Sequence, residues 1–214
     1  MQKLINGFHQ FRTSVFPRER QLFRTLAHKQ QPEVLFITCS DSRVVPHMIT
    51  QSRPGDLFVC RTVGNQIPQA SEMEEAVSSA IEYAVEALGV KHIVVCGHSD
   101  CGAMKALLKP ERVAKLPATA SWLRHANSAK SIVTDHYRGV TEETLLRLLE
   151  EENVLVQMEN LKTHASVASR LHNGSLQLHS WFYDIASGDI LTYNAASERF
   201  TPLAMAKTHL GGAA

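Results

Sequence analysis

Two short clusters of side chains in this sequence have the chemistry of a metal site. The first reads Cys-Ser-Asp-Ser-Arg at 39–43, and the second reads Gly-His-Ser-Asp-Cys-Gly at 97–102. Zinc takes about four ligands in tetrahedral geometry, drawn from thiolate, imidazole and carboxylate groups, and the two clusters supply that mixture. We therefore predict a zinc site formed by Cys39, His98 and Cys101, with Asp41 as the candidate fourth ligand.

The residue Arg43 bears on whether such a site is catalytic or only structural. A zinc ion with four protein ligands would merely hold the two loops together. A guanidinium group can bind a carboxylate through two parallel hydrogen bonds, so Arg43 can hold Asp41 away from the metal. The fourth position is then open to water, which is the property of a catalytic zinc site. The sequence therefore favours a catalytic centre.

Each cluster follows a short apolar run that is typical of a buried parallel strand. The run Val-Leu-Phe-Ile-Thr at 34–38 precedes Cys39, and His-Ile-Val-Val-Cys at 92–96 precedes His98 by one residue. In open α/β sheets, the loops after neighbouring strands open into one crevice. Both clusters are therefore expected at the same edge of one sheet.

Hydrophobic periodicity and turn signals predict the elements around this sheet. Further strands are expected at 57–62, and at 176–183 and 190–193, where the last two flank a turn at 186–189. Helices are expected at 73–88, at 121–133, from the cap Thr141 to 161, and at 164–171, with a short helical segment near Pro46. The predicted fold class is α/β: a mostly parallel central sheet flanked by helices, with an N-terminal helical arm and a C-terminal antiparallel edge strand.

Residues 1–30 are predicted to form the arm, as two helices joined at Pro17. Its apolar positions have helical spacing: Leu4, Ile5, Phe8, Phe11, Leu22, Phe23 and Leu26. These helices precede the first strand and cannot belong to its crossovers. From the pattern alone, they pack either on the chain's own core or on another subunit.

Composition narrows the class of protein. With 214 residues, 44% of them hydrophobic, the chain suits one sizeable core, and we predict a single domain over 1–214. The formal charge is +1, which points to neither a nucleic acid nor an anionic membrane as partner. We expect a cytoplasmic protein, because the sequence shows no apolar run typical of a signal peptide or a membrane span. Four cysteines in a reducing compartment indicate metal binding rather than disulfides, with Cys60 and Cys96 as buried hydrophobes.

The two motifs resemble those of the β-class carbonic anhydrases, in particular the bacterial group similar to cyanate-operon and plant enzymes. The pattern Cys-x-Asp-Ser-Arg followed by Gly-His-Ser-x-Cys-Gly carries the resemblance, which runs from about residue 5 to residue 203. It includes Arg-Pro-Gly-Asp-Leu-Phe at 53–58, Ala-Ile-Glu-Tyr-Ala at 80–84 and Trp-Phe-Tyr-Asp-Ile at 181–185.

The resemblance implies an enzyme that reversibly hydrates carbon dioxide to bicarbonate and a proton, by attack of zinc-bound hydroxide. Cys39, His98 and Cys101 would be the ligands of Zn²⁺, and Asp41 and Arg43 a catalytic dyad. The family's substrate pocket corresponds here to Gln30, Phe58, Val63, Tyr83 and Gly102. The resemblance also implies a homodimer or homotetramer in which neighbouring subunits exchange N-terminal helices and contribute Gln30, Phe58 and Tyr83 across the interface. It assigns no proton shuttle.

Three other functions use related chemistry. A zinc nucleobase deaminase needs His-x-Glu and Pro-Cys-x-x-Cys, and neither motif occurs in the sequence. A zinc-stabilised binding module without activity is a second alternative, against which the intact Asp41 and Arg43 argue. Hydrolysis of another small heterocumulene, such as COS or CS2, at the same centre stays open.

Two positions next to the first ligand bear on the fourth zinc position. In β-class enzymes that readily close, with the aspartate on the metal, Trp typically lies three residues before the first ligand and Gly one residue before it. Here these positions hold Phe36 and Thr38. We therefore expect the open form, with Asp41 paired to Arg43, at neutral to alkaline pH.

Overall fold

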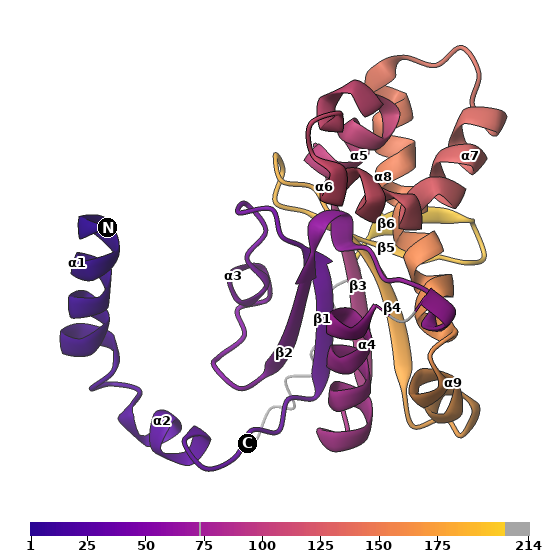
Figure 1. Ribbon diagram of the computed structural model, residues 1–214. Coiled ribbons are helices and arrows are strands. Elements are labelled where there is room, and N and C mark those ends of the chain that lie inside the picture. The colour runs from indigo at the N-terminus through magenta and orange to yellow at the C-terminus, as the bar shows by residue number, and fades with distance from the viewer. Residues whose placement is uncertain (73, 204–214) are drawn as a thin grey trace, which may run out of the picture.

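A six-stranded sheet forms the centre of the computed structural model, which describes residues 1–72 and 74–203. The strands are β1 (Val34–Cys39), β2 (Leu57–Thr62), β3 (His92–His98), β4 (Gln177–Tyr183), β5 (Ile190–Asn194) and β6 (Arg199–Pro202). Their order across the sheet is β2-β1-β3-β4-β5-β6 (Figure 1). The first four strands pair in parallel, whereas β5 and β6 are antiparallel additions. The predicted fold class is confirmed.

The C-terminal edge differs from the prediction in one respect. It has two antiparallel strands, and β6 was not predicted because only one of its four residues, Phe200, is strongly apolar. The end of the predicted domain, residues 204–214, lies outside the described residues, as does Met73, where a helix was predicted to begin.

The parallel register brings the ends of β1 and β3 to the same edge of the sheet. Val34 pairs with Leu57 on one side and with His92 on the other. From that common start, β1 ends at Cys39 and β3 ends at His98. The sheet therefore delivers both ligand loops to one edge, as the apolar runs predicted.

The helices are α1 (Gln2–Gln10), α2 (Arg20–Leu26), α3 (Pro46–Thr50), α4 (Glu75–Glu82), α5 (Gly102–Leu108), α6 (Pro117–Trp122), α7 (Asn127–His136), α8 (Glu142–Lys162) and α9 (Ala165–His172). Shorter or irregular turns are η1 (Phe11–Val15), η2 (Val63–Asn65), η3 (Ala70–Glu72), η4 (Tyr83–Ala87), η5 (Pro110–Val113) and η6 (Leu123–Ala126). The hydroxyl of Thr141 accepts a hydrogen bond from the Thr144 amide at 3.2 Å, so the predicted cap of α8 is confirmed.

The helix predicted at 121–133 was wrong in its boundaries. The chain instead forms α6, the turn η6 and α7 in succession. Pro117 occupies the first turn of α6, where its missing amide hydrogen has no helical acceptor to lose, so the helix begins there.

The two faces of the sheet are covered differently. One face packs against α4, α8 and α9, in a cluster that includes the fully buried Leu35, Ile93 and Phe182. The cluster on the opposite face is smaller, with Phe36, Val94 and Cys96 at its centre, and it draws one helical residue, Ile49 of α3. The chain's own helices therefore bury the first face much more fully than the second.

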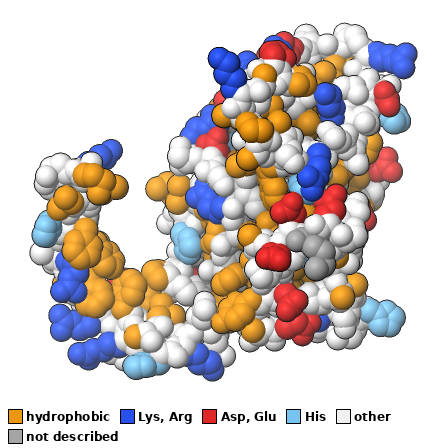
Figure 2. All heavy atoms as spheres, viewed as in Figure 1, with side chains coloured by type: hydrophobic (Ala, Val, Ile, Leu, Met, Phe, Trp, Pro, Cys, Tyr) orange, Lys and Arg blue, Asp and Glu red, His pale blue; other side chains and the backbone are white. Residues whose placement is uncertain are grey.

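The N-terminal arm stands away from this body (Figure 1). None of the residues in α1, η1 and α2 is buried, and Leu4 and Phe8 are 69% and 58% exposed. Figure 2 shows hydrophobic side chains gathered on the side of the arm that faces the body across an open gap. The arm therefore presents an apolar surface that the described part of the same chain does not bury.

Among residues 1–72 and 74–203, none of the helices combines the length and the apolar composition that crossing a bilayer requires.

Candidate metal centre

Three side chains with metal-binding atoms meet at the edge of the sheet where β1 and β3 end. The ligand atoms of Cys39, His98 and Cys101 lie within 4.8 Å of one another, and all three residues are buried. Cys39 is the last residue of β1, His98 is the last residue of β3, and Cys101 is the residue before α5. The structure thus brings together the three residues predicted as zinc ligands.

The imidazole of His98 is oriented for metal binding. Its Nδ1 lies 2.9 Å from the carbonyl oxygen of Ser99, and since a carbonyl can only accept, Nδ1 carries the hydrogen. The lone pair of this tautomer is on Nε2. That atom is buried and has no hydrogen-bond partner among the described residues. A metal ion would satisfy Nε2, and fixing the tautomer through Nδ1 is the usual arrangement of histidine ligands.

The two sulfur atoms form the rest of the donor set. Hydrogen bonding from the Cys101 thiol, with a further contribution from His98, lowers the pKa of Cys39, while the pairing with Cys39 and burial raise the pKa of Cys101. The amides of Asp41 and Gly64 also point at the Cys39 sulfur, at 3.4 and 3.3 Å. Two sulfurs and one imidazole nitrogen are a donor set that suits zinc, so the residues present fit that metal.

Asp41 is paired with Arg43 and does not join the three donors. The Nε and backbone amide of Arg43 donate to Asp41 Oδ1 at 2.9 Å each, and Nη2 donates to Oδ2 at 2.8 Å. These hydrogen bonds hold the pKa of Asp41 well below its usual range. Asp41 Oδ2 is still only 4.0 Å from His98 Nε2. An ionised carboxylate therefore lies beside the donor group while its oxygens face the guanidinium.

Two further residues, which the sequence did not single out, support the ligand loops. The guanidinium of Arg61 donates to the carbonyl oxygens of Cys39, Asp41 and Val44, at 2.6–3.1 Å. Glu150 of α8 accepts a hydrogen bond from the Cys101 amide at 2.7 Å, and burial raises the pKa of Glu150 to about 7.

A sequence signal for Glu150 was present on α8. Polar residues recur at helical spacing on the buried face of that helix, at Glu150, Asn153, Gln157 and Asn160. A buried polar residue needs a partner. Asn153 indeed donates to the Gly64 carbonyl at 2.9 Å, and Gly64 is the residue whose amide faces Cys39. Arg61 had no such signal, since an arginine near a strand end is ordinary.

The five predicted substrate-pocket residues fall into two groups. Gly102 directly follows Cys101, and Val63 precedes Gly64, so these two adjoin the metal donors in the same chain. Phe58 and Tyr83 contact each other, with ring centroids 5.9 Å apart, and line a groove with residues of α4 and η4. Gln30 is exposed on the segment between α2 and β1. Their place in a pocket stays a prediction.

Comparison with known proteins points to one family. The family model described as carbonic anhydrase matches residues 34–190. Relatives named carbonic anhydrase include one from Pseudomonas aeruginosa, 48% identical over 204 residues, which cover 95% of this chain and 92% of the relative. Another, from Synechococcus elongatus, is 46% identical over 213 residues, which cover 99% of this chain and 78% of the relative.

Solved structures give the same result. The β-carbonic anhydrase CcaA superposes with a TM-score of 0.93 at 45% identity, covering 96% of this chain and 92% of that chain. A tetrameric β-carbonic anhydrase from Sordaria macrospora superposes with a TM-score of 0.83 at 28% identity, covering 91% and 96%. The chain therefore belongs to the carbonic anhydrase family of enzymes and has the fold of its β class.

Proposed function

We propose that this enzyme hydrates carbon dioxide reversibly to bicarbonate and a proton, with Zn²⁺ held by Cys39, His98 and Cys101. The observation that carries the proposal is the buried group of two sulfurs and an unpartnered Nε2, with an ionised carboxylate beside it. When bound, zinc lowers the pKa of water, so that hydroxide is available near neutral pH to attack the carbon of CO2.

In this proposal, Asp41 and Arg43 orient the nucleophile. Asp41 is ionised and can only accept hydrogen bonds. It would therefore accept one from the attacking hydroxide, which still carries a hydrogen. That hydrogen bond would turn a lone pair of the hydroxide oxygen toward the substrate. Arg43 keeps Asp41 ionised and holds its two oxygens through three hydrogen bonds. With Asp41 held in this way, a metal bound by the three donors would keep a position for water, in line with a catalytic rather than a structural centre.

We further propose that the substrate pocket is completed by a second subunit. Val63 and Gly102 adjoin the donors within one chain, whereas Phe58, Tyr83 and Gln30 would come from the partner. The uncovered apolar side of the arm supports an assembly, and so does the tetrameric relative from Sordaria macrospora. A homodimer or homotetramer is the proposed form.

The test is stopped-flow CO2 hydration, with the zinc content measured on the same sample. We expect about one zinc per chain and a rate that rises from pH 7 to pH 9. Two thiolates cancel the charge of Zn²⁺, and a less positive centre stabilises hydroxide less than three imidazoles do. Full zinc occupancy with no hydration at any pH would instead support the zinc-stabilised binding module.

A further inference from the structure

The guanidinium of Arg43 is held on both sides. Asp41 occupies one side, through Nε and Nη2. On the other side, Nη1 donates to Asp100 Oδ2 at 3.0 Å, and Nη2 also donates to the Asp100 carbonyl oxygen at 3.0 Å. The side chains of Asp41 and Asp100 therefore bind different N–H groups and do not compete for a donor.

The backbone conformation of Asp100 makes this double contact possible. Asp100 lies between two of the metal donors, two residues after His98 and directly before Cys101, and its φ of 61° is left-handed. Aspartate is one of the few residues other than glycine that adopts this conformation readily. In this turn, the side chain and the carbonyl of one residue both reach Arg43, so the second ligand loop is tied to the dyad.

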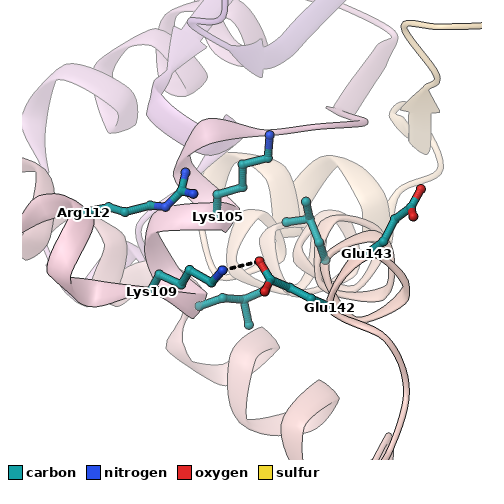
Figure 3. A pocket seen from close by; sticks show the side chains of 7 residues that line it. Lys105, Lys109, Arg112, Glu142 and Glu143 are labelled. Carbon is teal, nitrogen blue, oxygen red and sulfur yellow. Dashed lines mark ion pairs between the residues drawn. The ribbon is translucent and has the colours of Figure 1, made fainter.

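A lysine of α5 balances the charge of Asp100. Lys105 Nζ forms an ion pair with Asp100 Oδ1, which leaves Oδ2 for Arg43. Figure 3 shows Lys105 pointing away from the neighbouring ion pair of Lys109 with Glu142. Lys105 and Arg43 are the two cations paired with Asp100, and the charge of Asp100 also acts on Glu150 of α8. Because Lys105 offsets its charge, Asp100 acts on Arg43 mainly by fixing its position.

We propose that Asp100 is a positioning residue that anchors Arg43 and so keeps Asp41 off the metal. The proposal rests on the function proposed above. To reach the metal, Asp41 must break all its hydrogen bonds to a guanidinium that cannot follow it. Without the Asp100 carboxylate, Arg43 keeps only one of its two contacts with residue 100, the one to the backbone carbonyl, and its side chain gains freedom. The paired arrangement is then less favoured relative to the arrangement with Asp41 on the metal.

The test compares variants that separate the carboxylate from the backbone. Asp100→Gly removes the side chain but suits the left-handed conformation, so the carbonyl contact and the fold should persist. Asp100→Asn keeps an acceptor for Nη1 but loses the ion pair with Lys105. The matched control is Glu142→Gln, which breaks an exposed lysine–carboxylate pair near Lys105 that does not involve Arg43. Each zinc-loaded protein is assayed for CO2 hydration between pH 6.5 and 9.

In Asp100→Gly, we expect kcat/KM at pH 7 to fall by about three- to tenfold, and at pH 9 to lie within about twofold of the parent. The midpoint of the pH profile therefore moves upward, because a carboxylate on the metal competes best where hydroxide is scarce. Asp100→Asn should show a smaller shift, and Glu142→Gln none. In crystals of zinc-loaded Asp100→Gly at pH 7, an Asp41 oxygen should lie ~2.0 Å from zinc in part of the molecules.

The two proposals fail in different ways. A parent protein without zinc or without hydration activity would defeat the proposed function. The role of Asp100 would be overturned if the parent is active and its Asp100→Gly variant has the same pH profile. A profile lowered equally at all pH values, or a midpoint moved downward, would overturn it as well. A crystal of that variant with Asp41 fully paired to Arg43 at pH 7 would do the same.

Discussion

The body that carries the metal donors and the N-terminal arm are stabilised in opposite ways. In the body, Leu35, Ile37 and Val95 are fully buried, and the donors Cys39, His98 and Cys101 meet within the chain. The arm has no buried residue, and it contacts the body through an ion pair of Glu19 with Arg53 at 2.6 Å and the approach of Leu26 to Gly55.

This difference indicates that metal binding depends on the body and that assembly depends on the arm. Short helices are marginal in water without tertiary packing, and an exposed apolar stripe usually marks an interface. We therefore expect the donors to be organised within one chain, whereas the order of the arm depends on a second copy. Changes in the body should affect zinc and local stability, and changes in the arm should affect the oligomeric state.

The largest effect is expected from loss of a donor in the body. His98→Ala, Cys39→Ser or Cys101→Ser each remove one of three ligands, so zinc and activity should both fall to background. Metal analysis and stopped-flow assays on the same sample check this. The matched control is Cys60→Ser, since Cys60 is a free, partly buried thiol outside the donor group. Full zinc occupancy in an active His98→Ala protein would refute the assignment.

Removal of the arm tests the other side of the comparison. Deleting residues 1–26 removes the apolar stripe of Leu4, Ile5, Phe8 and Phe11. The surface of the partner subunit on which this stripe is expected to pack is then exposed to water. We expect aggregation or an inactive species of lower molecular weight in sedimentation experiments. A milder variant, Phe8→Ser, should weaken assembly without loss of zinc. A well-folded, active monomer lacking residues 1–26 would contradict the dependence on a partner.

The body was easier to predict from sequence than the arm, for a physical reason. Strands buried on both faces read as continuous apolar runs, so the positions of Cys39 and His98 at strand ends followed from local sequence. The polar spacing of α8 indicated that Glu150 is buried but not what it contacts, and the contacts of Asp100 with Arg43 and of Arg61 with the first ligand loop depend on long-range packing, which no local pattern encodes. For the arm, the helical period predicted helices, but a period does not say which surface covers them.

A buried carboxylate in the body should make stability depend on pH. Burial raises the pKa of Glu150 to about 7 from an ordinary 4.5. A group whose pKa is higher in the folded state contributes stability that is fully present below its unfolded pKa, and the contribution is lost as the pH rises through about 7. Ionised Glu150 therefore costs the metal-free protein about 3 kcal/mol at pH 9.

The variant that tests this is Glu150→Gln, which keeps an acceptor for the Cys101 amide but cannot ionise. Urea unfolding of the metal-free proteins at pH 5.5 and pH 9 gives the comparison. From pH 5.5 to pH 9, the free energy of unfolding should fall less in the variant than in the parent. Equal changes in both proteins would mean that Glu150 does not titrate in this range.

Close packing beneath the metal donors predicts a smaller effect. A Cβ added at Gly97 would lie 2.6 Å from Val154 Cγ2 and 3.4 Å from the Glu150 carbonyl oxygen. Gly97→Ala should therefore cost about 1–3 kcal/mol of unfolding free energy, as overpacking does. The double variant with Val154→Ala should recover part of that loss, so the two substitutions should be non-additive in denaturation experiments. Strictly additive changes in unfolding free energy would show that the cost of Gly97→Ala does not come from contact with Val154.

The smallest expected change concerns Asp41, which we predict stays where it is when zinc binds. Phe36 is buried with its ring edge-to-face against Trp181, at 6.0 Å between centroids, and offers no N–H for a bicarbonate oxygen. The Thr38 hydroxyl donates to the Cys96 carbonyl at 2.8 Å, so its side chain is fixed in space that glycine would leave empty. A bicarbonate ion beside the Asp41–Arg43 pair would therefore lack a donor and some room here, so we expect it to give closure little support.

Closure should nevertheless appear as the pH falls. Hydroxide at the fourth position is lost by protonation, whereas Arg43 keeps the pKa of Asp41 low, so the carboxylate stays ionised and competes for the metal. Crystals of the zinc-loaded enzyme grown near pH 8 should show Asp41 bound to Arg43 by the contacts described above. An Asp41 oxygen at ~2.0 Å from zinc at that pH would show that Phe36 and Thr38 do not favour the open form.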